Sequence, residues 1–161
     1  MTIKHPLKLT LSWLAVLLLM LAIFLFSAQP AAISDSNSVT IAAWVVETTV
    51  KLTGAEIPEL EKQQLIINVN NVGREYMHGV VFLVLGLLVQ NAVTQSGARG
   101  IRAPALALAI CITYGLAGEI HQLFVPGRAF QASDLAMDTA GSITGIAIMW
   151  FVYNIRRDKL R

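Results

Sequence analysis

The fold of this chain is decided by residues 9–26, which read LTLSWLAVLLLMLAIFLF and hold no charged side chain. A helix needs about 20 mostly apolar residues to cross the hydrocarbon core of a bilayer. Three further stretches of similar character occupy about residues 76–93, 103–125 and 135–153. The sequence therefore predicts an all-α membrane protein, a four-transmembrane-helix bundle in one domain over residues 1–161.

Composition excludes the other broad classes of protein. Of the 161 residues, 55% are hydrophobic and only 14% are charged, against about 25% charged in a typical soluble domain. Disordered chains are poor in apolar residues, so this composition also excludes disorder. The single cysteine, Cys111, excludes a disulfide scaffold, and a net charge of +2 gives no case for nucleic-acid binding.

The first apolar stretch has two interpretations. Lys4 and Lys8 precede it and small residues follow it at 27–32, as in a cleaved signal peptide. The stretch is, however, longer than the usual signal-peptide core of about 7–15 residues, and Pro30 is poorly placed for cleavage. Retention as a membrane anchor is the favoured interpretation.

Residues 28–73, between the first two spans, form the one sizeable polar region. Within it, residues 38–52 carry apolar positions at helical spacing and predict an amphipathic helix. Trp44 in that helix suits the headgroup level of a membrane. Pro58, followed by acidic residues, predicts the start of another short helix. We expect this short helical segment to lie on the membrane or to cap the bundle.

Basic residues predict the orientation, because cytoplasmic flanks of membrane spans are enriched in Lys and Arg. Eight of them fall on one side, in the N-terminus, the 94–102 loop and the C-terminal tail. The other side carries four: Lys51, Lys62, Arg74 and Arg128. Both termini are therefore predicted to be cytoplasmic, and residues 28–73 and 126–134 to face outward.

Polar side chains gather near the outward ends of three predicted spans. They form pairs three or four residues apart, a spacing that places both members on one helix face. Ionisable groups at membrane depth are costly and mark function by default. The candidate functional polar cluster consists of Arg74, His78, Glu119, Gln122, Arg128, Asp134 and Asp138. Within it, the planar guanidinium of Arg128 is a suitable partner for Glu119 or Asp138.

Simpler structural interpretations remain open for several of these residues. His78 is satisfied by a backbone carbonyl in many comparable settings, and Arg74 can serve as a headgroup anchor. Asp134 is suited to cap the fourth span. Gly141 and Gly145 are four apart and predict close helix packing. Glu119 and Asp138 are hardest to explain structurally, because carboxylates inside apolar helices need partners.

Motifs of known chemistries are missing from the sequence. It holds no Gly-x-Ser-x-Gly elbow, phosphate loop, dinucleotide fingerprint or His-Glu-x-x-His pair. Glu119, Asp134 and Asp138 have ligand types that suit a hard divalent cation, but their spacing does not require one. We therefore predict neither a metal site nor a cofactor.

At these same residues the sequence closely resembles the VanZ-like family. Residues 119–128 read EIHQLFVPGR, which is similar to the family pattern Glu-x-x-Gln-x-Phe-x-Pro-x-Arg. The pattern continues with an acid, an Asp or Asn four residues later and two spaced glycines, matching Asp134, Asp138, Gly141 and Gly145. A second block around Arg74 and His78, and a looser one around Phe24, Ser27, Gln29 and Pro30, extend the resemblance over nearly the whole chain.

The chain departs from the family pattern mainly in the second span. Glu75 replaces the usual lysine, Val81-Phe82 replaces a Glu-Tyr pair, and Gly118 replaces the acid that often precedes Glu119. These changes leave the third- and fourth-span half of the pattern intact. They put in question what the second span contributes.

The resemblance implies a bacterial cell-envelope membrane protein linked to glycopeptide resistance, chiefly to teicoplanin. Three functions follow from the residues. The first is a protein of the plasma membrane that binds or modulates a lipid-linked or cell-wall precursor, or a glycopeptide. The second is a membrane-embedded enzyme that acts on such a precursor through Glu119, Asp138 and His78. The third is a structural bundle without a ligand.

Overall fold

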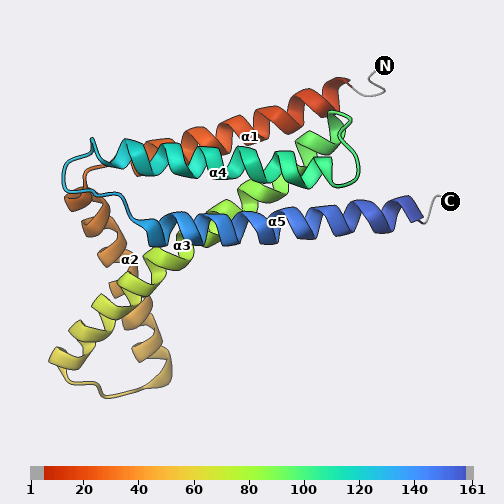
Figure 1. The fold of residues 1–161 in the computed structure, drawn as a ribbon. Coiled ribbons are helices and arrows are strands. Elements are labelled where there is room, and N and C mark those ends of the chain that lie inside the picture. Colours follow the sequence, from red (N-terminus) through yellow and green to blue (C-terminus); the bar gives the residue numbers. More distant parts are fainter. Residues whose placement is uncertain (1–5, 159–161) are drawn as a thin grey trace.

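The structure, a computed structural model that describes residues 6–158, consists in this range of five α-helices without any strand (Figure 1). The helices are α1 (Pro6–Ser27), α2 (Ala31–Thr53), α3 (Glu59–Gln95), α4 (Arg102–Gln122) and α5 (Ala132–Asp158). The predicted all-α architecture is confirmed.

Four of these helices are long and apolar enough to cross a membrane: α1, α3, α4 and residues Ala132–Ile155 of α5. Their outer surfaces are apolar, and Leu17 and Leu18 of α1 are 60% and 58% exposed. Such surfaces are stable in hydrocarbon and would be an aggregation liability in water. The predicted four spans are confirmed by length and composition.

The main difference from the sequence prediction concerns α3. The short helix expected after Pro58 and the span expected from Tyr76 are one continuous helix of 37 residues. At 1.5 Å per residue such a helix is about 55 Å long, well beyond a hydrocarbon core of about 30 Å. A helix of this length is too long for one upright crossing, and its first part lies beside α2. Helix α2 starts at Ala31, seven residues before the expected position. Residues 28–73 are a helical hairpin closed at Gly54, where φ is +66°.

Glycines bring the backbones of α3 and α5 together. A Cβ built on Gly141 would overlap the carbonyl oxygen of Gly79, and one on Gly145 would overlap that of Leu83. A Cβ on Gly86 would likewise meet the backbone of Ser142. Small residues that let backbones approach closely are the usual basis of helix association in membranes.

The two ends of the bundle are built differently (Figure 1). At one end, called here the α2 end, α1 and α4 finish, α5 starts, and the backbone N–H of Ala31 donates to Pro126 O at 3.2 Å. The loop after α3, the start of α1 and the end of α5 lie at the opposite end. Both described termini are thus on the same side of the bundle.

Candidate functional site at the α2 end

His78 is the point at which α3 and α5 exchange polar contacts. Its Nδ1 atom lies 3.3 Å from Oδ1 of Asp138, and its Nε2 atom lies 3.9 Å from Oδ2 of Asp134. The two aspartates are four residues apart and share a face of α5. One imidazole therefore faces both carboxylates, and Asp138 is 4% exposed.

Glu119 enters the same region from α4. Its side chain is buried at 2% exposure, and its Oε2 atom accepts a hydrogen bond of 2.7 Å from the backbone N–H of Gln131. The bond fixes the segment that leads into α5 against the end of α4. It explains how a carboxylate is kept at this depth, because a buried acceptor needs a donor.

Arg128 is not the partner of these acids. The ion pair expected between Arg128 and Glu119 or Asp138 is wrong: no salt bridge joins these three described residues. Glu119 takes its hydrogen bond from the Gln131 backbone, and Asp138 is engaged by His78. The Nε atom of Arg128 is buried without a hydrogen-bond partner.

Arg74 also turns away from the cluster, because it forms an ion pair with Asp35 of α2. The pair joins the first turns of α2 to the middle of α3 and so sets the direction of the helical hairpin. Sequence reasoning missed Asp35, since 39 residues separate the two charges and no helical spacing relates them.

Gln122 connects α4 to α1. Its Nε2 atom donates to Ser27 Oγ at 3.2 Å, while its Oε1 atom is buried without a partner. Beside it, the His121 ring packs against Phe24 with 4.9 Å between centroids. These contacts hold the end of α1 and belong outside the His78 site.

The structure thus divides the seven candidate residues into two groups. The carboxylate cluster, defined here as His78, Glu119, Asp134 and Asp138, lies between α3, α4 and α5. Arg74, Gln122 and Arg128 lie elsewhere at the same end of the bundle. Asp134 falls in the first turn of α5, whose first residue is Ala132, and faces His78. Among the described residues, no group of three or more His, Cys, Asp or Glu side chains is arranged to hold a metal ion.

A comparison with protein-family models identifies the family of this chain. The model of the family described as VanZ/LLP1 matches residues 12–153. The chain belongs to the VanZ/LLP1 family. Searches of curated proteins and of solved structures found no match.

The match includes two of the four spans of this VanZ/LLP1 protein in full, most of the first and fourth, and both groups of candidate residues. Asp134 and Asp138, which resemble the family signature, face His78, and Glu119 of the same signature enters this region from α4, bonded to the Gln131 backbone. Gln122, from the same signature, instead supports the packing of α1.

Sequence reasoning missed a second polar group at the opposite end of the bundle. Ser12 Oγ accepts hydrogen bonds from Asn91 Nδ2 at 3.1 Å and Gln95 Nε2 at 2.8 Å, and Tyr153 Oη donates to Asn91 Oδ1 at 2.7 Å. The group connects α1, α3 and α5 without a formal charge. Its side chains stand near the ends of apolar stretches, where amides and hydroxyls are common, so no pattern in the sequence marked them.

Proposed function

We propose that this VanZ/LLP1 protein binds an amine-bearing component of the bacterial cell envelope at the carboxylate cluster. One observation carries the proposal: two carboxylates lie within 4 Å of a single imidazole, a third, Glu119, is buried on the adjacent α4, and neither nearby arginine pairs with any of them. With the three carboxylates ionised, even a protonated His78 leaves this cluster with an excess of negative charge. A primary ammonium group, with three N–H donors, complements such a cluster in charge and in hydrogen bonding.

The predicted orientation supports an envelope ligand. The α2 end carries four Lys and Arg residues against eight on the opposite side, which favours an outward position for the α2 end in the plasma membrane. The carboxylate cluster then lies on the side of the membrane on which lipid headgroups of the outer leaflet and cell-wall precursors are found. Through such a ligand, the protein is expected to change susceptibility to teicoplanin-type glycopeptides.

A soluble probe tests the headgroup recognition alone. Glycerophosphoethanolamine and its N-acetyl derivative differ in the ammonium charge, so we expect the purified protein to bind only the former in calorimetry. Asp134→Asn and Glu119→Gln should each weaken that binding by about tenfold, equivalent to about 1.4 kcal/mol. The matched control is Glu59→Gln, which changes an acid at the first residue of α3, 19 residues before His78, and should bind normally. Equal binding of the two probes would contradict the proposal.

The contact between His78 and Asp138 favours acid–base chemistry as a second candidate. A buried carboxylate that holds an imidazole fixes its orientation, as a general acid or base requires. An enzyme would convert components of an envelope lipid extract, and mass spectrometry would show new products that disappear with His78→Gln. Binding without any such product would leave the first proposal in place.

A further inference from the structure

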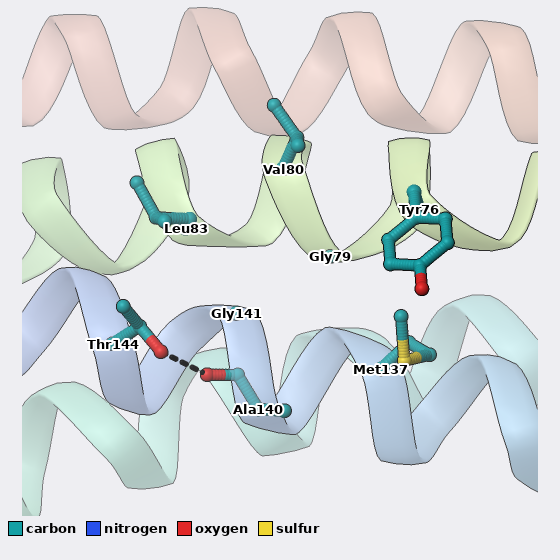
Figure 2. A pocket seen from close by; sticks show the side chains of 8 residues that line it. All are labelled: Tyr76, Gly79, Val80, Leu83, Met137, Ala140, Gly141 and Thr144. Atoms are coloured by element: carbon teal, nitrogen blue, oxygen red, sulfur yellow. Dashed lines mark hydrogen bonds between the residues drawn. The ribbon is translucent and has the colours of Figure 1, made fainter. Parts of the chain in front are cut away.

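A small apolar groove runs between α3 and α5 on the outside of the bundle. Its volume is about 210 Å³, and its walls include Tyr76, Gly79 and Leu83 of α3 and Met137, Ala140 and Thr144 of α5. Figure 2 shows Tyr76 and Met137 at one end of the groove and Leu83 and Thr144 at the other. The groove exists because the glycine contacts described above leave no side chains along its floor.

The groove lies at the same depth as the carboxylate cluster. Gly79 directly follows His78, and Met137 directly precedes Asp138. Consecutive residues of a helix are separated by about 100° around its axis. The groove therefore lies on faces of α3 and α5 next to those that carry His78 and Asp138, while Glu119 of the cluster belongs to α4.

The surface of the groove accepts an alkyl chain better than a polar molecule. Thr144 Oγ1 donates to the carbonyl oxygen of Ala140 at 2.9 Å (Figure 2), so the hydroxyl of this wall is already satisfied. The remaining walls are hydrocarbon, thioether and glycine backbone, with the Tyr76 ring at one end. Tyrosine is favoured at the headgroup level of membranes, where its ring is apolar and its hydroxyl is hydrated. Tyr76 therefore marks where a headgroup would sit and where an alkyl chain would enter.

The size of the groove suits part of one acyl chain. A water-sized atom group takes about 30 Å³ in a liquid, so 210 Å³ holds roughly seven such groups. That is enough for a segment of one acyl chain lying along the groove. Val80 at the rim is 52% exposed, which leaves the groove open to the bilayer.

We propose that this groove seats an acyl chain of a phospholipid whose headgroup amine is held by the carboxylate cluster. The site for the lipid headgroup rests on the proposed function, whereas the site for the acyl chain rests on the groove. It narrows the ligand from any amine-bearing envelope component to an aminophospholipid of the bilayer that surrounds the protein.

The test uses lipids with a photoactivatable diazirine in the acyl chain, carried on either an ethanolamine or a glycerol headgroup. The full chain is placed in vesicles of phosphatidylethanolamine and phosphatidylglycerol, irradiated, digested and mapped by mass spectrometry. We expect ethanolamine-lipid adducts at Tyr76, Leu83 and Met137 to exceed those on the exposed Leu17 and Leu18 of α1. Ala140→Phe, which fills the groove from an exposed position, should lower the groove adducts by about tenfold. Ala147→Phe, the same change seven residues further along α5 and outside the groove, is the matched control.

The two parts of the proposal fail in different ways. Asp134→Asn with Glu119→Gln should remove the preference for the ethanolamine lipid while chain adducts persist in the groove. Adducts spread evenly over α1 and the groove, or unchanged in Ala140→Phe, would overturn the acyl-chain site. Cross-linked dimers through the groove in place of lipid adducts would overturn it in favour of a second copy of the chain.

Discussion

The Nδ1 atom of His78 lies 3.3 Å from Oδ1 of Asp138. The next residue of α3, Gly79, is in close backbone contact with Gly141 of α5. The same segment of α3 thus makes both the polar and the closest backbone contact with α5. A hydrogen bond placed there restricts how the two helices can slide, because sliding would leave the buried Asp138 carboxylate without its imidazole partner.

Substitutions at Asp138 should show whether stability depends on its hydrogen-bond acceptor or on its charge. Asp138→Asn retains an oxygen that accepts from the imidazole, so the melting temperature in detergent should stay near that of the native protein. Asp138→Leu removes the acceptor and should destabilise the bundle by about 1–3 kcal/mol. Equal melting temperatures for the two variants would show that His78 does not need this partner.

Substitutions at Glu119 should distinguish a ligand site from a structural bundle. Glu119→Gln keeps an oxygen for the Gln131 N–H, which is bonded at 2.7 Å in the structure, and removes only the charge. It should fold normally but bind the amine about tenfold more weakly and reduce the proposed effect on teicoplanin susceptibility. Glu119→Leu should also unfold more easily, by about 1–3 kcal/mol. If Glu119→Gln left binding and susceptibility unchanged, the structural interpretation of the cluster would be preferred.

Gly145→Ala should separate α3 from α5. The added methyl group would overlap the Leu83 carbonyl oxygen and approach the Leu87 nitrogen at 2.9 Å. Because both neighbours are backbone atoms, the helices must move apart, at a cost of about 1–3 kcal/mol or more. Gly118→Ala is the matched control: its Cβ meets nothing within 4 Å, and alanine favours a helix by up to about 1 kcal/mol. Thermal unfolding of both variants checks the difference, and an equal response would exclude a tight contact at Gly145.

Much of this architecture follows from the sequence because hydrophobic length alone specifies a membrane helix. The four spans, and the small residues at 141 and 145 where α3 and α5 touch, all had a pattern to reveal them. No such pattern predicted that α3 would be one continuous helix. Its residues 66–75 include three asparagines and a glycine, which are poor helix formers, and contacts with α2 override that preference.

The candidate cluster was only partly predictable for a related reason. Helical spacing predicted that Asp134 and Asp138 share one face. The predicted order of the spans placed His78 and Glu119 at the same end of the bundle. Spacing does not reveal which of several charges are partners across helices. Arg128 is chemically suited to Glu119, yet the carboxylate is occupied by a backbone N–H three residues further along the chain. Every residue except proline has a backbone N–H, so the sequence does not show which of them will bond a given carboxylate. The partner of Glu119 could therefore not be predicted before the fold was known.

The polar group around Ser12 should hold α1 in the bundle. Its hydroxyl oxygen accepts from both Asn91 and Gln95, so Ser12→Ala leaves two amide donors without that acceptor. The expected loss of stability is about 1–2 kcal/mol, since polar contacts between membrane helices contribute on this scale. Thr10→Val, on an exposed side chain bonded only to Pro6 O of its own helix, is the control. A Ser12→Ala protein as stable as the control would show that apolar packing alone retains α1.

The orientation of the bundle is the prediction on which an outward ligand site depends. Ser36 and Gln131 are exposed at the α2 end, and Ser96 is exposed just after α3 at the opposite end. In a Cys111→Ala background, which removes the single native cysteine, a cysteine is placed at each position in turn. Because the α2 end carries four basic residues against eight, cysteines at 36 and 131 should react with a membrane-impermeant maleimide on intact cells. The cysteine at 96 should react only after the membrane is permeabilised. The reverse pattern would place the carboxylate cluster on the cytoplasmic side, and its ligand would then have to come from the inner leaflet or the cytoplasm.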